Sequence, residues 1–316
     1  MDVLVLSRED VVRLLSVEQL LDALADGFVR LSAGEVSAPP RVAASAPSGI
    51  LAAMPGYLPG AGGGLEVKLV SVFPGNHALG LPSHQALITV FSAETGAPEA
   101  VMDGEHITAV RTAASSALAA RVLARPDARV LAVLGAGVQG RAHLRAMSSV
   151  LPLASVRVAS RTFTHAEALA TEDPRAVAVP SFEEAVRGAD VVCCCTDAGT
   201  PVLRRSWLSS GAHVSSVGAS ASGPEVDAET IAAGLVVVES RVACSPWPAG
   251  AHELAGVAPA AVVELGEVLS GAHPGRTSAT QLTVWKSMGH AVEDAVAARL
   301  VLDAARAAGA GTVVRL

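Results

Sequence analysis

The sequence predicts an α/β protein with a doubly wound parallel sheet, accompanied by a second domain of the α+β class. Three observations support this prediction. Strand and helix patterns alternate over residues 129–238, a glycine-rich motif at residues 135–140 separates one such strand from its helix, and the residues before 120 follow a different order. With 316 residues, the chain has room for two domains of ordinary size.

The composition excludes several classes of protein. Hydrophobic residues make up 51% of the chain and charged residues 17%, which is incompatible with intrinsic disorder. The 23 basic and 30 acidic residues give a net charge of −7 and form no basic run, so we expect neither a nucleic acid nor a membrane surface as partner. A small molecule is the expected partner.

No targeting segment is recognised in the sequence. Charged residues, Gly or Pro interrupt every apolar stretch before the roughly 20 residues that a membrane-spanning helix needs. The first ten residues carry neither a basic segment nor a long apolar one, which argues against a secretory signal. A cytoplasmic location is therefore expected.

The cysteines and histidines do not have the spacing of metal sites. Cys193, Cys194 and Cys195 are consecutive in an apolar run and Cys244 stands alone, which predicts reduced, buried thiols. The nine His residues include no H-E-x-x-H motif or other paired ligand spacing, so we predict no catalytic metal.

The N-terminal part reads as an α+β domain. Apolar residues recur at near-helical spacing from Ser7 to Leu31, with Ser16 as the cap between two helices. Strands joined by loops follow up to residue 64, and further strand patterns cover residues 65–72, 85–91 and 98–102. We expect this domain to span residues 1–120 and to be completed by the C-terminal helix at 290–316.

The second domain is expected over residues 121–289. Helices are predicted over 138–150 and 165–171. The predicted strands are 129–134, 156–159, 176–179, 191–196, 213–217 and 235–238. Residues 282–308 read as one long helical stretch, bent near Gly289 and packed on the first domain, with Lys286 on its solvated face.

The motif Gly135-Ala136-Gly137-Val138-Gln139-Gly140 has the form G-x-G-x-x-G and lies directly between a strand and a helix. Gly135 permits the tight turn, Gly137 lets the backbone approach a pyrophosphate, and Gly140 lets helix and strand pack closely. This context favours a Rossmann-type dinucleotide site over a glycine-rich turn without a ligand.

The end of the following strand indicates which dinucleotide binds. A free ribose 2′-hydroxyl usually meets an Asp or Glu there, but this chain reads Ser160-Arg161-Thr162. A guanidinium and two hydroxyls suit a 2′-phosphate, so NADP(H) is favoured and NAD(H) is the second choice. The competing interpretation is that Arg161 is only a solvated residue at a strand end.

Basic residues in apolar surroundings mark the candidate substrate site. Only Lys68 and Lys286 among the 23 basic residues are lysines, and Lys68 lies in a largely apolar strand. An ammonium buried there could bind a carboxylate or transfer a proton, whereas on an edge strand it would only extend to water. Arg111, near the expected domain boundary, could reach an anion, and Arg41 fits either a substrate clamp or a surface charge.

Several segments, in one order, give the chain a resemblance to the ornithine cyclodeaminase and mu-crystallin family, closest to its mu-crystallin, or ketimine reductase, branch. The segments are Met54-Pro55-Gly56-Tyr57, Lys68-Leu69-Val70, Leu81-Pro82-Ser83-His84-Gln85, Val101-Met102-Asp103-Gly104, Ile107-Thr108-Ala109, Arg111-Thr112-Ala113-Ala114, Gly135 to Gln139, Ser160-Arg161-Thr162, Val217-Gly218-Ala219-Ser220, Glu264-Leu265-Gly266-Glu267, Trp285-Lys286-Ser287-Met288-Gly289 and Val292-Glu293-Asp294.

The resemblance implies a homodimer whose first domain binds substrate and dimerises, while the central domain holds a nicotinamide cofactor. It implies that Arg41, Lys68 and Arg111 hold a substrate carboxylate beside Met54, and that Lys68 also serves in proton transfer. The residues it implies for cofactor binding are Ser83, Arg111, Gly135, Gly137, Val138, Gln139, Ser160, Arg161, Thr162, Thr196 and Ser220.

One departure separates the branches of the family. Cyclodeaminases and alanine dehydrogenases carry an Asp in the turn that here reads Gly218-Ala219-Ser220. A hydroxyl is no useful base near neutral pH, so deamination is disfavoured unless Asp227, seven residues on, takes over the role. Ser220 joins Lys68 and Arg111 as the residues expected in catalysis.

The function implied is NAD(P)H-dependent reduction of the C=N bond of a small cyclic ketimine carboxylate. Δ1-Pyrroline-2-carboxylate and Δ1-piperideine-2-carboxylate are the expected substrates. Ornithine cyclodeaminase or L-alanine dehydrogenase activity is the alternative within enzymes. An NADPH-dependent ligand-binding protein without turnover is the alternative outside them.

Overall fold

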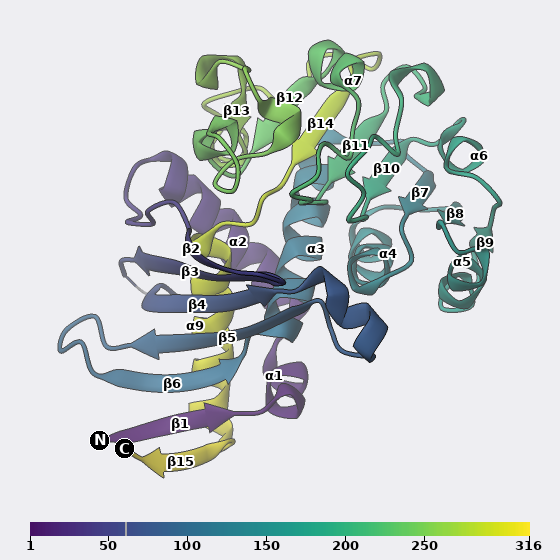
Figure 1. The fold of residues 1–316 in the computed structure, drawn as a ribbon. Coiled ribbons are helices and arrows are strands. Elements are labelled where there is room, and N and C mark those ends of the chain that lie inside the picture. The colour runs from purple at the N-terminus through teal and green to yellow at the C-terminus, as the bar shows by residue number, and fades with distance from the viewer. Residues whose placement is uncertain (61) are drawn as a thin grey trace. The chain divides into compact units, whose positions relative to one another are not determined.

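The computed structural model describes residues 1–60 and 62–316, which form two compact units. Unit 1 contains Met1–Arg111 and His290–Leu316, and unit 2 contains Thr112–Gly289 (Figure 1). The chain passes from unit 1 to unit 2 within helix α3 (Gly104–Leu123) and returns between Gly289 and His290.

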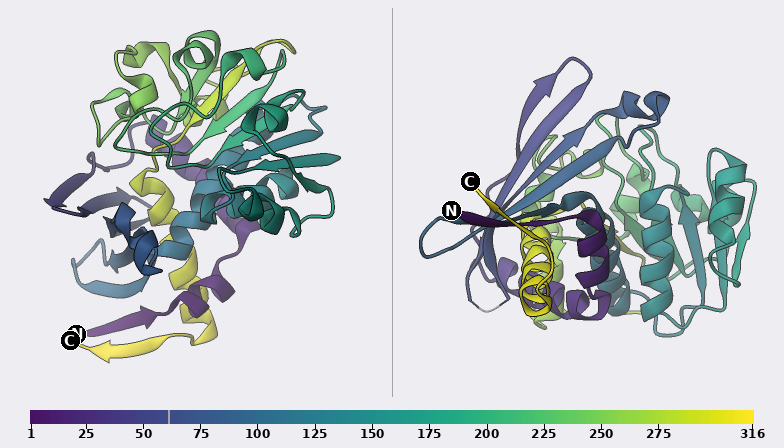
Figure 2. Two further views of the ribbon diagram at one scale, coloured as in Figure 1. Left: turned by 45° about the vertical axis from the view of Figure 1, so that its right-hand side comes forward. Right: turned by 90° about the horizontal axis from the view of Figure 1, so that it is seen from below.

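Unit 1 is built on a mixed seven-stranded sheet in the order β15-β1-β6-β5-β4-β3-β2. The strands are β1 (Asp2–Leu6), β2 (Val42–Ala46), β3 (Gly49–Leu58), β4 (Gly64–Val72), β5 (His84–Phe91), β6 (Pro98–Asp103) and β15 (Thr312–Arg315). Only the β1–β6 pair is parallel among them. The first and last strands pair, which brings the two termini side by side (Figure 2).

Helices cover one face of this sheet. They are α1 (Arg8–Leu14), α2 (Val17–Ser32) and α9 (Ala291–Ala308), with the start of α3, whereas the short helix η1 (Pro74–Leu79) connects β4 to β5. The Ser16 hydroxyl accepts a hydrogen bond from the Gln19 amide at 3.3 Å, which confirms the cap predicted between the first two helices. At Gly27 a Cβ would lie 3.3 Å from Val292 and from Val296, so α2 and α9 pack closely.

The two faces of the sheet differ. Strand alternation turns Met54 and Lys68 towards α9, where both are buried. The opposite face carries a row of cross-strand neighbours that starts at Val42 and continues through Ala53 and Leu69 to Leu87. Three of these four side chains are exposed apolar groups in the single chain.

Unit 2 is an eight-stranded parallel sheet in the order β13-β12-β14-β11-β10-β7-β8-β9. Its strands are β7 (Val130–Leu134), β8 (Ser155–Ala159), β9 (Ala176–Ala178), β10 (Val191–Cys194), β11 (His213–Ser216), β12 (Leu235–Val238), β13 (Val263–Glu264) and β14 (Thr283–Lys286). Its helices are α4 (Val138–Val150), α5 (Phe163–Ala170), α6 (Phe182–Val186), α7 (Ala228–Ala233), α8 (Leu265–Leu269), η2 (Arg205–Trp207), η3 (Arg241–Cys244), η4 (His252–Leu254) and η5 (Pro259–Ala261). The predicted alternation of strand and helix, and with it the fold class, is confirmed.

The prediction of one long helix over residues 282–308 is wrong. Thr283–Lys286 form strand β14 between β11 and β12, and α9 begins only at Ala291, after a turn at Gly289 with φ of +72°. A short apolar run rich in β-branched and aromatic residues fits a buried strand as well as a helix, and periodicity alone does not separate the two. Lys286 is therefore completely buried in a central strand instead of solvated.

The four cysteines are free thiols, as expected, but only Cys193 and Cys194 are fully buried. Burial, with the nearby charge of Glu225, raises the pKa of both thiols, so they are poor nucleophiles. Across residues 1–60 and 62–316, no helix is both long and apolar enough to span a bilayer.

Candidate functional site

Unit 1 contains a buried cluster of two cations and two carboxylates. The Lys68 Nζ on β4 lies 2.7 Å from Asp294 Oδ2 on α9. Arg111 on α3 places its Nε 3.1 Å from Asp294 Oδ1 and its Nη1 3.0 Å from Glu293 Oε2. The side chains of Lys68 and Arg111 are 2% and 4% exposed, and both carboxylates are fully buried.

Local structure explains why these side chains meet. Lys68 lies on the face of β4 that α9 covers, and Glu293 and Asp294 lie in the first turn of that helix. Carboxylates are stabilised near a helix N-terminus by the helix dipole. Glu293 also accepts the His290 amide at 2.8 Å in a capping box, so the same residue caps the start of the helix and binds Arg111.

Burial and nearby charges shift the pKa values of both Lys68 and Asp294. Burial, with the charges of Arg111 and Arg41, lowers the pKa of Lys68 to about 8, although Asp294 opposes the shift. Burial disfavours the ionised form of Asp294, but Arg111 and Lys68 outweigh it and lower the pKa of that carboxyl. The Lys68 ammonium can therefore lose and regain its proton near neutral pH while Asp294 stays ionised.

Glu66 is a further carboxyl on the same face of β4, two residues before Lys68. It is 2% exposed, and neither of its carboxyl oxygens has a hydrogen-bond partner among residues 1–60 and 62–316. Burial, reinforced by Asp294, raises its pKa well above the usual value against the opposing charges of Lys68 and Arg111. Burial thus favours the protonated form of this carboxyl, which lies beside two cations and two carboxylates. The sequence analysis missed Glu66, although its i, i+2 spacing from Lys68 was a usable signal.

The other residues expected at the substrate are also in unit 1. Met54 is the cross-strand partner of Lys68 and is buried. Arg41 is half-buried just before β2, close enough for its charge to act on Lys68. Ser83, which was expected at the cofactor, lies before β5, and its hydroxyl hydrogen-bonds His84 Nδ1 at 3.0 Å.

In unit 2, the glycine-rich loop has the form that a pyrophosphate requires. Gly135 has φ of +103°, and a Cβ at Gly140 would lie 1.9 Å from the Gly135 carbonyl oxygen, so neither position tolerates a side chain. Gly137 borders open space, since a Cβ added there would have no atom of another described residue within 4 Å apart from its chain neighbours. It is the N-cap of α4 and provides no side-chain hydrogen bond to the helix. The first amides of the helix thus have no side-chain acceptor, which suits an anion.

Two further features of this loop fit a dinucleotide. The buried Gln139 Oε1 has no hydrogen-bond partner, so a polar ligand group would satisfy it. The Gly135 amide donates to the Ala159 carbonyl at 2.8 Å, which places the loop beside Ser160 at the end of β8. Arg161 and Thr162 follow, both exposed, and no acid stands at this strand end. Val138, at the start of α4, is also exposed.

Thr196 and Ser220 follow the ends of neighbouring strands. A Cβ at Gly135 would lie 3.1 Å from the Thr196 methyl group, so Thr196 borders the glycine loop. The Ser220 hydroxyl accepts the Ser222 amide at 3.1 Å within its own turn. Sequence reasoning missed the carboxylate of Glu225, which hydrogen-bonds Thr196 and the start of the Ser220 turn.

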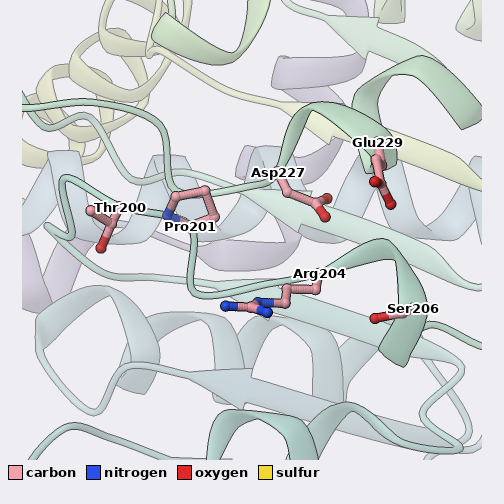
Figure 3. A pocket seen from close by; sticks show the side chains of 6 residues that line it. All are labelled: Thr200, Pro201, Arg204, Ser206, Asp227 and Glu229. Atoms are coloured by element: carbon pink, nitrogen blue, oxygen red, sulfur yellow. The ribbon is translucent and has the colours of Figure 1, made fainter.

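The carboxylate of Asp227, seven residues beyond Ser220, is held by two backbone amides. Its Oδ1 accepts the Thr230 amide and its Oδ2 the Arg205 amide, each at 3.0 Å, so both oxygens are used to cap α7 and hold a loop. The carboxylate lines a polar surface pocket with Arg204 (Figure 3). The alternative that left room for deamination through Asp227 thus loses its support.

No three His, Cys, Asp or Glu side chains are arranged to hold a metal ion within the described residues, 1–60 and 62–316. The glycine loop and parallel sheet of unit 2, with a separate unit that buries a cation–carboxylate cluster, define an α/β protein of the dinucleotide-binding class. The sequence matches the ornithine cyclodeaminase/mu-crystallin family over residues 1–309, and the chain belongs to this family. The resemblance seen in the sequence is thereby confirmed.

Individual proteins of known name are similar to this chain in sequence and in structure. The chain is 42% identical to the ketimine reductase mu-crystallin of Mus musculus over 257 residues, which cover 81% of this chain and 80% of the mouse protein. The structure of Thermococcus litoralis Δ1-pyrroline-2-carboxylate reductase with NADH and L-proline is similar with a TM-score of 0.93, 32% identity and coverage of 98% and 100% of the two chains. An archaeal alanine dehydrogenase dimer with bound NAD gives a TM-score of 0.90, 30% identity and complete coverage of both chains.

Proposed function

We propose that this protein is an NAD(P)H-dependent reductase of small cyclic ketimine carboxylates, acting on Δ1-pyrroline-2-carboxylate or Δ1-piperideine-2-carboxylate. The observation that carries the proposal is the buried cluster of Lys68 and Arg111, in a chain whose other unit has a pyrophosphate loop and Ser220 in place of an acid. Relatives named ketimine reductase, and a similar structure with NADH and L-proline, support it.

The cations of unit 1 recognise the substrate and supply its proton. Arg111 and Arg41 bind the carboxylate, and Arg111 keeps a rigid orientation because Glu293 and Asp294 hold its guanidinium. Lys68 donates a proton to the imine nitrogen, which its lowered pKa permits. The raised pKa of Glu66 favours its uncharged form, which limits the negative charge that would repel the incoming carboxylate.

The dinucleotide is held by unit 2 and supplies the hydride for the imine carbon when it is bound. Gly135, Gly137, Val138 and Gln139 hold the pyrophosphate at the start of α4. Ser160, Arg161 and Thr162 hold the adenosine ribose and its 2′-phosphate, which makes NADP(H) the preferred cofactor and NAD(H) the second. Ser83, Arg111, Thr196 and Ser220 complete the set of proposed cofactor contacts.

The exposed apolar row on the sheet of unit 1 supports a homodimer. Val42, Leu69 and Leu87 present adjacent apolar side chains to solvent on the face opposite α9, and such patches mark interfaces. The similar alanine dehydrogenase is a dimer. Light scattering of the purified protein should give twice the chain mass, and Leu69→Glu should give a monomer.

Turnover of imines tests the proposed function directly. Purified protein is mixed with NADPH and each of the two cyclic imines, and the loss of the reduced cofactor is followed by absorbance. Substrate-dependent oxidation is expected with at least one imine. Release of ammonia from L-ornithine, or NAD-dependent oxidation of L-alanine, without imine reduction would assign the rival activities. Cofactor binding without any turnover would leave a binding protein.

A further inference from the structure

The carboxylate of Glu225 is the centre of a second buried polar cluster, in unit 2. Its Oε1 accepts hydrogen bonds from the Thr196 amide at 2.6 Å and the Thr196 hydroxyl at 2.7 Å. Its Oε2 accepts the Ser216 hydroxyl at 2.8 Å and the Gly218 amide at 2.9 Å. Four donors fill the acceptor positions of this carboxylate, so the Glu225 side chain has little freedom to move.

These bonds join the ends of two neighbouring strands. Thr196 follows β10, whereas Ser216 ends β11 and Gly218 begins the turn that leads to Ser220. A Cβ at Gly218 would lie 2.5 Å from the Thr196 carbonyl oxygen, so the two segments are already in close contact. Glu225 thus fixes both segments at the carboxyl end of the parallel sheet, where open α/β sheets bind their ligands.

Lys286 and Glu253 complete this cluster from other elements. The Lys286 Nζ on β14 donates to the Gly218 carbonyl at 2.6 Å and to the Ser216 hydroxyl at 3.1 Å. Glu253 Oε1 accepts from Lys286 at 3.2 Å and from the Glu225 amide at 2.7 Å. Gly218 is therefore held through its amide by Glu225 and through its carbonyl by Lys286.

The cluster has an excess of negative charge. Two carboxylates face one ammonium, and the side chains of Lys286 and Glu253 are 0% and 3% exposed. Because the surroundings are buried, this charge is weakly screened by solvent. A cationic group bound beside Thr196 and the Gly218 turn would be stabilised relative to a neutral one.

We infer that Glu225, with Glu253 and Lys286, positions Thr196 and the Ser220 turn for the nicotinamide ring. The negative charge of this cluster increases the affinity for the oxidised, cationic ring relative to the affinity for the reduced, neutral ring. The inference rests on the proposed function, because it requires a nicotinamide beside these two segments. The ring gains one positive charge when it gives up hydride, so a fixed anion favours the direction of imine reduction. Glu225 is a positioning residue, since it acts through Thr196 and Gly218.

The test compares dissociation constants without any turnover. Titration calorimetry gives the dissociation constants of NADP⁺ and NADPH for the wild-type protein and for Glu225→Gln. The variant should weaken both cofactors about tenfold, because the Gly218 amide or the Ser216 hydroxyl loses its acceptor. The ratio of the NADP⁺ constant to the NADPH constant should also rise about fivefold, because one buried negative charge is removed.

Two further variants keep the test decisive. Glu253→Gln retains the acceptor oxygen and removes only the charge, so the variant should fold normally. Its ratio of the NADP⁺ to the NADPH dissociation constant should still rise. Glu239→Gln is the matched control. This buried carboxylate accepts the Ser287 hydroxyl at 2.6 Å and the Gly289 amide at 2.8 Å, and it follows β12, which β14 and β11 separate from β10 and Thr196. The ratio of this variant should stay at the wild-type value.

An unchanged ratio in both Glu225→Gln and Glu253→Gln would overturn the inference, even if Glu225→Gln binds both cofactors weakly. That result would leave Glu225 as a structural residue only. Wild-type protein that binds neither NADP⁺ nor NADPH would instead contradict the proposed function, so the two failures are distinguishable.

Discussion

The Lys68 Nζ lies 2.7 Å from Asp294 Oδ2, and both side chains are buried, at 2% and 0% exposure. Removing two charges from water is costly, and such a pair contributes little to stability compared with apolar side chains of similar size. The pair instead holds an ammonium in an apolar environment with its pKa lowered to about 8. A lysine in this state can give up a proton under physiological conditions, which an exposed lysine does poorly.

The pH dependence of imine reduction should follow Lys68. The reaction needs its ammonium form, so kcat/KM should fall as the pH rises through about 8, the pKa of Lys68. Lys68→Arg keeps the positive charge but cannot release a proton, so it should reduce kcat strongly and lose this step in the profile. Initial rates from pH 6 to 10 test both. A step near pH 8 that persists in Lys68→Arg would belong to another group.

Asp294→Asn should change both the pH–rate profile of imine reduction and the free energy of unfolding. Removing the carboxylate leaves two buried cations without their shared partner, which should lower the free energy of unfolding by about 3–5 kcal/mol. Since Asp294 raises the pKa of Lys68, its loss should move the alkaline step to lower pH. Denaturant titrations and rate profiles measure these effects.

The control for Asp294→Asn is Asp303→Asn on the same helix. Asp303 pairs with Arg299 and is about half exposed, so this change should alter the unfolding free energy by less than about 1 kcal/mol. Asp294→Asn protein that is destabilised but keeps the alkaline step at its wild-type pH would show that Asp294 acts only in folding.

Glu66→Gln should make the stability of the folded protein less dependent on pH. The folded-state pKa of Glu66 is raised, so between the ordinary pKa of 4.5 and the folded-state pKa the folded protein holds a proton that the unfolded chain has released. Wild-type stability therefore falls as pH rises from about 4.5 towards the folded pKa, and Gln, which never ionises, removes this loss. The melting-temperature difference between variant and wild type should grow with pH. Glu94→Gln, at an exposed position, should show no such trend; a flat difference for Glu66→Gln would mean that Glu66 is ionised in the folded protein.

The sequence was most informative where function depends on local pattern. The glycine loop could be predicted because its strand, turn and helix are consecutive, and the structure has α4 at the predicted bounds, Val138–Val150. Lys68 was found because a lysine is unusual both in this chain and in an apolar strand. Neither inference needed knowledge of distant contacts.

Other parts of the sites depend on tertiary structure. The pairing of Glu293 and Asp294 with Lys68 and Arg111 requires α9, which follows Arg111 by about 180 residues and Lys68 by more than 220, to cover β4. The misassigned helix at 282–308 concealed Lys286, because a central strand in a parallel sheet is as apolar as a buried helix. Glu225 has no local signal either, since its four donors come from the ends of two other strands.

Arg161→Ala tests the cofactor preference. A guanidinium that binds a 2′-phosphate contributes a charge-assisted contact, so the KM for NADPH should rise about tenfold or more while the KM for NADH stays within twofold. Arg187→Ala is the control, because this exposed arginine at the end of α6 in unit 2 forms a salt bridge with Glu183 of the same helix. Steady-state kinetics with each cofactor measures the two KM changes. Equal changes for NADPH and NADH would show that Arg161 does not contact the 2′-phosphate and is a solvated residue at the end of its strand.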